Sequence, residues 1–259
     1  MHNFDFVKPG SVAEAAEALK AEDAMALGGG QTLIPTMKAR LNAPSALVSL
    51  SGMAEMVGVS GSDPVVIGGA TTHGQVAAEA GYPALAALAG QIGDPAVRSR
   101  GTIGGSLANN DPAACYPAAA LASGAVIKTD RREIVADDFF VGMFETALEE
   151  GEIITSVSFP VPAKANYQKF LQPASRFALV GVFVAQFDSG VRVAVTGASE
   201  EGVHRWSAAE EALSANFSAE ALEGLSVASD GLMSDLHGSA EYRAHLVKVM
   251  TGRAVRAAG

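Results

Sequence analysis

Two glycine-rich segments contain the residues of this sequence that are best suited to chemistry. The first, Gly28-Gly29-Gly30-Gln31-Thr32-Leu33, follows a short apolar stretch, AMAL, that is typical of a buried strand. Because glycine leaves the main chain unobstructed, successive N–H groups there can line up on an anionic diphosphate. The segment predicts a phosphate cradle, with an ordinary strand-ending turn as the alternative.

This first glycine segment is not one of the two common phosphate-binding motifs. Leu33 stands where the third glycine of a dinucleotide-binding fingerprint belongs, and no helix pattern opens immediately after the loop. The lysine of a P-loop is missing as well. The sequence therefore excludes both a Rossmann fingerprint and a Walker motif at this position.

The second glycine-rich segment, GTIGGSLANNDPA, runs from 101 to 113. Its glycines and its turn-forming Asn, Asp and Pro residues favour a shaped loop over a regular element. The adjacent Gly104 and Gly105, with hydroxyl and amide side chains around them, let a flat ring or a phosphate approach the main chain closely. A structural turn with Asx-type hydrogen bonds is the alternative.

The remaining candidates for chemistry are weaker. The single cysteine, Cys115, cannot form a disulfide framework or ligate an iron–sulfur cluster alone, and we expect it to serve in packing. Arg98 and Arg100 precede the second segment and could pair with a diphosphate, or could be solvated loop residues. No metal site is predicted, because the histidines are widely separated and lack metal-binding spacing: His2, His73, His204, His237 and His245. His73 alone lies close to the glycine segments, and a core or rim position is expected for it.

Composition narrows the class of protein. The chain has 259 residues, of which 49% are hydrophobic and 18% charged, as in ordinary folded domains. A net charge of −10 with scattered basic residues disfavours nucleic acid and anionic membranes as partners. No apolar run approaches the roughly 18 residues of a membrane span, and the N-terminus lacks a secretory pattern, so we expect a cytoplasmic protein.

Strands and helices must position the two glycine segments. A helix is expected over 11–23, opened by a capping box of Ser11 and Glu14. The other predicted helices cover 73–80, 84–92, 116–123, 206–215, 218–222 and 239–255. Predicted strands cover 24–27, 46–50, 64–72 (with glycines and threonines at its end), 125–130, 132–136, 152–159, 167–176, 178–187 and 191–199.

A domain boundary is expected near residue 165, where the Pro160 and Pro162 pair meets the polar stretch AKAN. The first domain would cover 1–165, in subdomains of about 1–55 and 56–165. The second, 166–259, would contain a three-stranded antiparallel sheet followed by helices.

The two glycine segments are far more specific together, about 70 residues apart with Gly68-Gly69-Ala70-Thr71-Thr72 between them. In this order the sequence resembles the FAD-binding medium subunits of the xanthine dehydrogenase and carbon monoxide dehydrogenase family. That family carries an A-G-G-Q/H-S/T-L-type loop and a T-I-G-G loop. The resemblance runs nearly end to end, through Phe4, Pro9, Ser11, Val12, Glu14 and Ala15, then Asp94 to Arg98, Gly151 to Ile154, and Lys169 to Val182.

The resemblance implies a fold and a set of cofactor-binding residues. The fold would be α+β, of the FAD-binding PCMH type (vanillyl-alcohol-oxidase-like), with two α/β subdomains clasping FAD and a C-terminal α+β domain. The implied FAD-binding residues are Leu27, Gly28, Gly29, Gly30, Gln31, Thr32, Leu33, Ala70, Thr71, Thr102, Gly104, Gly105, Ser106, Asn109, Ile154 and Lys169.

Within this set, the resemblance assigns the first glycine segment to the diphosphate, and Thr102 to Ser106 to the flavin side of the diphosphate and the ribityl chain. Ala70, Thr71 and Asn109 would line the ribityl or isoalloxazine region, and Ile154 and Lys169 would flank the ring. Cys115 stands where the family often has an acidic residue, which puts one ribityl contact in doubt.

The resemblance also implies a function without a catalytic residue in this chain. FAD would receive electrons from two [2Fe-2S] clusters on a small partner, while a large partner would hold the molybdenum–pterin centre, in a dimer of heterotrimers. Two alternatives are a self-contained FAD-dependent oxidase or reductase on the same fold, and a scaffold that has lost the flavin. The substrate of the complex and its electron acceptor are not encoded in these residues.

Overall fold

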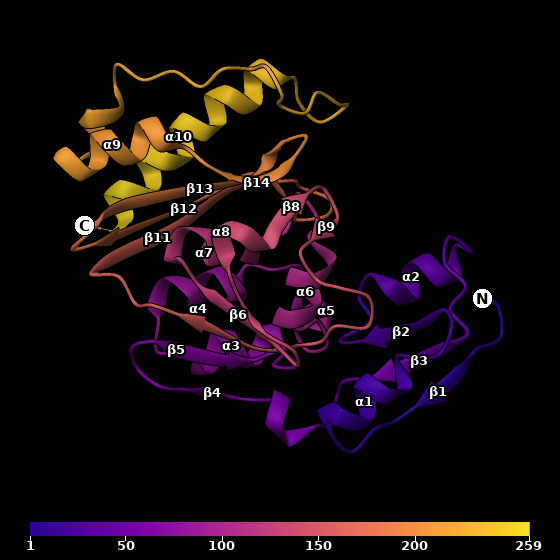
Figure 1. The fold of residues 1–259 in the computed structure, drawn as a ribbon. Helices are drawn as coiled ribbons and strands as arrows, with labels where there is room; N and C mark the ends of the chain where they lie inside the picture. The colour runs from indigo at the N-terminus through magenta and orange to yellow at the C-terminus, as the bar shows by residue number, and fades with distance from the viewer. Residues whose placement is uncertain (259) are drawn as a thin grey trace.

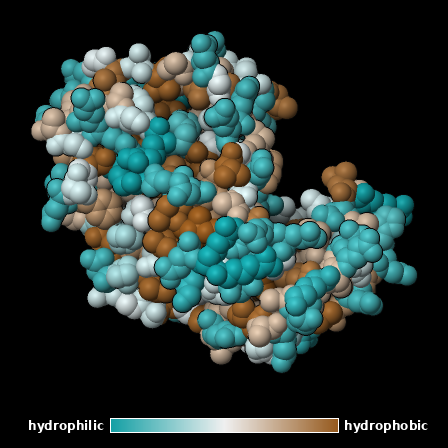
Figure 2. All heavy atoms as spheres, in the orientation of Figure 1, coloured by the Kyte–Doolittle hydropathy of each residue, from teal (hydrophilic) through white to brown (hydrophobic). Residues whose placement is uncertain are grey.

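The computed structural model describes residues 1–258, and its strands form three units that follow one another along the chain (Figure 1). A three-stranded sheet forms the N-terminal unit, a five-stranded sheet the central unit and a four-stranded sheet the C-terminal unit. In Figure 1 the N-terminal unit, in indigo, stands apart on the right, and the C-terminal unit covers the top of the central one. Figure 2 shows the surface hollowed between the N-terminal unit and the rest of the molecule.

The N-terminal unit is a small parallel sheet in the order β1 (Asp5–Val7), β3 (Ala46–Ser49) and β2 (Ala24–Leu27). The central strand β3 is buried along its whole length, as expected for a parallel strand covered on both faces. Two helices accompany the sheet, α1 (Val12–Ala18) and α2 (Leu33–Lys38).

Helix α1 is shorter than the sequence predicts, because it ends at Ala18 rather than near residue 23. Its start is as expected, since the Ser11 hydroxyl accepts from the Glu14 N–H at 3.2 Å. Glu14, however, reaches back to the N–H of Gly10 at 2.8 Å, one residue beyond the reciprocal partner of a capping box. After Ala18 the chain tightens and turns through Asp23, whose positive φ of 57° is incompatible with helix.

The central unit is an antiparallel sheet in the order β4-β5-β10-β6-β7. Its strands are β4 (Val59–Ser60), β5 (Val65–Gly68), β6 (Val126–Thr129), β7 (Glu133–Val135) and β10 (Ile154–Phe159). Its helices are η1 (Ala54–Met56), α3 (His73–Glu79), α4 (Pro83–Gly90), α5 (Pro95–Arg98), α6 (Ile103–Asn109), α7 (Tyr116–Ser123) and α8 (Ala136–Phe139). Helix α7 is buried along its whole length and lies at the centre of the largest hydrophobic cluster. A small hairpin, β8 (Phe140–Gly142) and β9 (Glu145–Thr146), completes this unit.

The C-terminal unit is an antiparallel sheet in the order β11-β12-β13-β14, so the prediction of three strands was wrong by one. Its strands are β11 (Lys164–Leu171), β12 (Ala178–Phe187), β13 (Gly190–Ser199) and β14 (Gly202–Arg205). Strand β14 is only four residues long and ends in His204 and Arg205, so it lacks the apolar alternation by which strands are recognised. Three helical segments, α9 (Ser207–Ala215), η2 (Ala219–Leu222) and α10 (Ala240–Ala258), cover the sheet as predicted.

A buried carboxylate stabilises the turn between β6 and β7. Both oxygens of Glu152 accept from Arg132, from Nε and Nη2 at 3.0 Å each, and the Thr129 hydroxyl donates at 2.7 Å. Burial opposes ionisation of Glu152, but the hydrogen bonds from Arg132, the Glu149 N–H and Thr129 outweigh it and lower the carboxyl pKa from 4.5 to about 2. The ionised form is therefore part of the folded structure.

We expect Glu152→Gln to lower the free energy of unfolding at pH 7 by about 2 kcal/mol. A depressed carboxyl pKa stabilises the fold above the unfolded value of 4.5 and loses that effect as pH falls towards 2. The free energies of unfolding of wild type and variant should therefore converge in this acid range, as measured by urea unfolding at several pH values. Glu149→Gln is the matched control, because the Glu149 side chain is 62% exposed and shares the cluster. An unchanged stability gap at pH 3 would contradict this account.

Among the helices of residues 1–258, none is long and apolar enough to cross a membrane.

Candidate functional site

The first glycine segment is a tight turn over 28–32 that joins β2 to α2, which begins at Leu33, so the expectation that no helix opens immediately after it was wrong. Gly30 turns the chain with a positive φ of 71°, and its carbonyl accepts from the Ile34 N–H at 3.1 Å. Glycine is needed at this position because the left-handed region is costly for other residues. The helix was missed because Pro35 and Thr36 obscure its periodicity, although Pro is well tolerated in a first helical turn.

This turn presents a row of unused main-chain donors. Within residues 1–258, no acceptor is paired with the N–H of Gly29, Gly30, Gln31, Thr32 or Leu33. The Gln31 and Thr32 side chains are exposed beside them, and Gln31 Nε2 reaches only the Gly29 carbonyl, at 3.1 Å. Unpaired N–H groups converging at one turn are a donor set suited to an anion.

The second glycine-rich segment is helical over Ile103–Asn109 (α6), so the prediction of an irregular loop was wrong there, whereas 110–113 are irregular as predicted. Thr102 begins the helix, and its hydroxyl accepts from the Gly105 N–H at 3.2 Å. Gly104 lies so close to the 68–72 segment that its N–H donates to the Gly69 carbonyl at 2.9 Å. A methyl group on Gly104 would lie 2.6 Å from that oxygen, so close packing overrides the low helix propensity of glycine.

Helix α6 presents one polar stripe to the outside. Gly105 is exposed and Ser106 and Asn109 are half-buried, while Ile103, Gly104 and Leu107 are buried on the opposite side. The spacing of three and four residues places the exposed set on a single face. The side chains of Ser106 and Asn109 make no hydrogen bond with the rest of the described chain, so they are available to a ligand.

The two glycine segments meet main chain to main chain. A methyl group on Gly29 would overlap the carbonyl oxygen of Arg100, and one on Gly28 would lie 2.9 Å from the Thr102 hydroxyl and 3.8 Å from Gly105 Cα. Because Gly28 and Gly29 have no side chains, the free donors of the first segment and the exposed stripe of α6 become neighbours. The structure thus brings together residues that are about 70 positions apart in the chain.

The 68–72 segment packs against the start of α6 and holds it in position. The Thr71 carbonyl accepts from the Ile103 N–H at 3.1 Å, and the Thr71 hydroxyl is bound to the main chain of Gly58, accepting from the N–H at 2.9 Å and donating to the carbonyl at 3.1 Å. Ala70 and Thr71 are buried, as is Ile154, whose carbonyl would overlap a methyl group on Gly69. These predicted site residues therefore hold α6 in place, and the Thr71 hydroxyl is already committed to protein.

Lys169 lies in a different environment from the glycine segments. Its Nζ donates to the carbonyls of Gln91 at 2.8 Å and Arg176 at 3.0 Å, and lies 3.6 Å from Cys115 Sγ. None of its hydrogen bonds within the described chain goes to either glycine segment. Its predicted contact with a flavin ring stays a prediction.

His73 is a core residue that connects α3 to the second glycine segment. Its N–H donates to the Gly101 carbonyl at 2.9 Å, and its ring lies 5.3 Å from the ring of Tyr116. The side chain is 5% exposed, and Nδ1 has no hydrogen-bond partner within residues 1–258. Burial, and then the nearby charge of Arg98, lower the His73 pKa to about 4, so the imidazole is neutral in the folded protein.

Arg98 has a structural role in this structure. Its Nη1 donates to the carbonyls of Ile92 at 3.0 Å and Gly93 at 3.3 Å, which fixes the loop before α5. Of the two roles left open for the arginines, the structure favours the loop role for Arg98.

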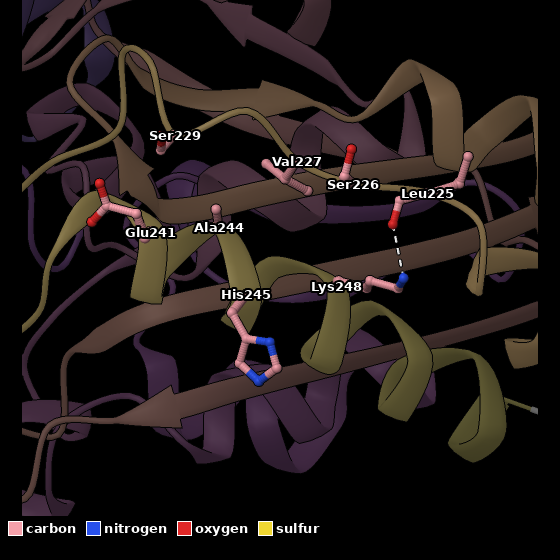
Figure 3. A pocket seen from close by; sticks show the side chains of 8 residues that line it. All are labelled: Leu225, Ser226, Val227, Ser229, Glu241, Ala244, His245 and Lys248. Carbon is pink, nitrogen blue, oxygen red and sulfur yellow. Dashed lines mark hydrogen bonds between the residues drawn. The ribbon is translucent and has the colours of Figure 1, made fainter.

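One surface pocket lies away from the glycine segments. It has a volume of about 330 Å³ and lies between α10 and the segment around Leu225. Figure 3 shows Glu241, His245 and Lys248 projecting from α10, with Lys248 donating to the Leu225 carbonyl at 2.8 Å. None of the predicted cofactor-binding residues lines it. Among residues 1–258, no cluster of three or more His, Cys, Asp or Glu side chains could hold a metal ion.

Comparison with known proteins gives matches over most of the chain. The sequence profile of the family described as "FAD binding domain in molybdopterin dehydrogenase" matches residues 2–162. The nicotine 6-hydroxylase medium subunit of Paenarthrobacter nicotinovorans is 35% identical over 98% of this chain and 96% of its own length. The carbon monoxide dehydrogenase medium chain of Hydrogenophaga pseudoflava is 32% identical, with 98% and 96% covered.

Solved structures agree over the whole chain. A chain of carbon monoxide dehydrogenase from Hydrogenophaga pseudoflava superposes with a TM-score of 0.89 at 33% identity, covering 99% of this chain and 97% of the other. A chain of quinoline 2-oxidoreductase from Pseudomonas putida 86 gives a TM-score of 0.88 at 30% identity, again covering 99% and 97%.

Proposed function

The chain belongs to the family of FAD-binding subunits of molybdopterin dehydrogenases, and we propose that it holds FAD at the glycine junction and transfers electrons there. It is an oxidoreductase subunit of the molybdenum hydroxylase type, and its fold is that of the FAD-binding PCMH-type proteins. The observation that carries the proposal is the meeting of the free N–H groups of 29–33 with the exposed stripe of α6.

The residues at the junction fit the cofactor. FAD carries an anionic diphosphate, which matches the unpaired main-chain donors of Gly29 to Leu33. Gln31 and Thr32 would add side-chain hydrogen bonds, and Leu27, which ends β2, would abut the same site. Gly105, Ser106 and Asn109 leave a polar, unobstructed helix face for the ribityl chain.

When bound, FAD supplies the conversion between two-electron and one-electron transfer, and the protein supplies binding and electrostatics. The main-chain donors hold the diphosphate, while the close contact of Gly28 and Gly29 with 100–105 excludes water beneath it. His73 is 5% exposed and packs against Tyr116, so its ring does not face the exposed stripe of α6. This arrangement agrees with an electron-transfer subunit whose substrate is oxidised in another subunit.

The proposed partner subunits follow from the proposal that the substrate is oxidised in another subunit. We propose that a small subunit holds [2Fe-2S] clusters, that a large subunit holds the molybdenum–pterin centre, and that the complex is a cytoplasmic dimer of heterotrimers. The names of the relatives, medium subunit and medium chain, support an assembly with further subunits. We also propose a division into domains at 1–165 and 166–259, with subdomains of about 1–55 and 56–165. It is supported by the family match to 2–162 and by the start of β11 at Lys164.

The rival function is a self-contained FAD-dependent oxidase or reductase on the same fold. Such an enzyme needs a substrate pocket with a proton donor beside the flavin. The relatives named medium subunit or medium chain match 98% of this chain, which supports the electron-transfer function over this rival.

The proposal is tested by purifying the chain alone and with the products of its neighbouring genes. Absorption bands of FAD in the chain alone, with iron and molybdenum only in the complex, are the expected result. A flavin-free chain without a metal-containing partner would overturn the proposal. A flavin-containing chain that oxidises a substrate unaided would establish the rival.

Lys169→Met tests the one predicted side-chain donor to the flavin. If Lys169 stabilises the anionic edge of reduced flavin, we expect the reduction potential to fall by tens of millivolts, because a nearby positive charge is lost. The potential is measured by dye-coupled titration of the purified flavoprotein, with Lys248→Met as the control in the C-terminal unit. An unchanged potential and an unchanged FAD affinity would restrict Lys169 to its observed contacts with Gln91 and Arg176.

A further inference from the structure

Lys169 and Cys115 form an amine–thiol pair under the turn that joins β11 and β12. Nζ of Lys169 lies 3.6 Å from Cys115 Sγ, and the thiol is 5% exposed while the lysine is half-buried. In the part of the chain that the structure describes, no carboxylate forms an ion pair with this lysine. The amine therefore lies next to the thiol with no carboxylate bound to it.

A buried hydroxyl faces the same thiol. Tyr167 lies two residues before Lys169 on β11, so both side chains lie on one face of the strand. Its hydroxyl is beside Cys115 and the residue is 3% exposed; apart from this thiol, the oxygen has no hydrogen-bond partner within residues 1–258. Because a thiol is a weak hydrogen-bonding partner, the hydroxyl is poorly satisfied in this hydrophobic core. It is placed to donate to an oxygen atom added to the sulfur.

We propose that Cys115 and Lys169 are the two ends of a reversible oxidative crosslink. Hydrogen peroxide oxidises the thiol by two electrons, giving a sulfenic acid and one water, and Tyr167 donates to the new oxygen. The Lys169 ammonium releases one proton to solvent, and its amine attacks the sulfur. An S–N bond forms, the S–O bond breaks, and the hydroxyl leaves as a second water by taking a proton from nitrogen. The product is a sulfenamide, which thiol reductants return to thiol and amine.

The crosslink would change the surroundings of the β11–β12 turn. Nζ would leave the carbonyls of Gln91 and Arg176 and lose its positive charge, so the contact between 91–93 and 172–177 would loosen. This inference goes beyond electron transfer and does not depend on it, because the pair needs only an oxidant.

Peptide mapping of the purified protein, with its flavin and partners as expressed, tests the proposal. Trypsin normally separates Cys115, in the peptide 101–128, from Lys169, where it also cleaves. After brief treatment with hydrogen peroxide, we expect loss of cleavage at Lys169 and a joined pair of peptides, 101–128 and 165–176. The mass of the pair should be lower by two hydrogen atoms, and dithiothreitol should restore both peptides.

Two variants and an internal control for the oxidant dose complete the experiment. Cys115→Ser should give no joined peptides, and Lys169→Arg should instead give a sulfenic acid at Cys115 that is trapped by dimedone. Met143, which is 39% exposed, reports through its sulfoxide that the oxidant dose was sufficient. The proposal is overturned if Met143 is oxidised while Lys169 is still cleaved and Cys115 remains free. Conversion of wild-type Cys115 to sulfinic acid without joined peptides would overturn it equally.

Discussion

Replacing Gly29 with alanine is expected to weaken FAD binding about 100-fold, which corresponds to a loss of about 3 kcal/mol of binding free energy. The added methyl group would overlap the carbonyl oxygen of Arg100, a main-chain atom that cannot rotate away. The two glycine segments would have to separate, and the free N–H groups of 29–33 would move away from the α6 stripe. Overpacking of this kind typically costs 1–3 kcal/mol, and here it falls directly on the site.

The measurement is the ratio of FAD to protein after gel filtration, followed by fluorescence titration of the apoprotein. Gly81→Ala is the matched control, because Gly81 is exposed and a methyl group there meets nothing within 4 Å. Circular dichroism should show that Gly29→Ala keeps its secondary structure, since the change lies at a junction between units. Wild-type FAD content in Gly29→Ala would refute the assignment of the junction as the site.

Acid is expected to destabilise the folded chain between pH 6.5 and 4 through His73. The folded protein holds the His73 pKa at about 4, against 6.5 for a free imidazole, so in this interval only the unfolded chain binds the proton. The full stability is therefore present above pH 6.5 and decreases as pH falls. The size of the loss is about 3 kcal/mol, because each pKa unit is worth about 1.4 kcal/mol.

His73→Gln removes the titrating group, and the variant should lose most of this pH dependence even if it is less stable overall. The free energy of unfolding, measured by urea at pH 7.5, 6, 5 and 4, reports the effect. His237→Gln is the control, since that side chain is exposed. Equal slopes for wild type and His73→Gln would show that His73 is not the source. Glu152 acts in a lower interval, below pH 4.5, so the two contributions can be separated.

The two segments of the candidate site could be picked out from the sequence, but their geometry could not be predicted. The glycine spacing identified both segments, whereas the helical state of Ile103–Asn109 depends on contacts with Gly69 and Thr71, which are more than thirty residues away. Local propensity argues against helix at Gly104 and Gly105, and tertiary packing decides the outcome. The strands and helices with clear periodicity were recovered, whereas strands too short to carry a pattern were not: β1, β4, β8, β9 and β14.

Side-chain roles were the least predictable part. Thr71 and Lys169 carry donors that suit a flavin, yet in this structure the first is bound to Gly58 and the second to Gln91 and Arg176. Hydrogen bonds between distant segments leave no signature in a single sequence. The neutral state of His73 was equally hidden, because it follows from burial and from Arg98 rather than from the neighbours of His73 in the chain.

The close packing of Gly69 against the Ile154 carbonyl has a consequence for synthesis on the ribosome. Helix α6 packs against Gly69, and Gly69 packs against β10. Strand β5 pairs with β10 from Val65 to Gly68. The first glycine segment, although made early, therefore has no surface to dock on until Phe159 has left the exit tunnel. Such long-range pairing is slow and exposes apolar strands meanwhile. We therefore expect this protein to need a chaperone most while the nascent chain still ends before β10. We expect cofactor binding to begin only after β10 has been synthesised.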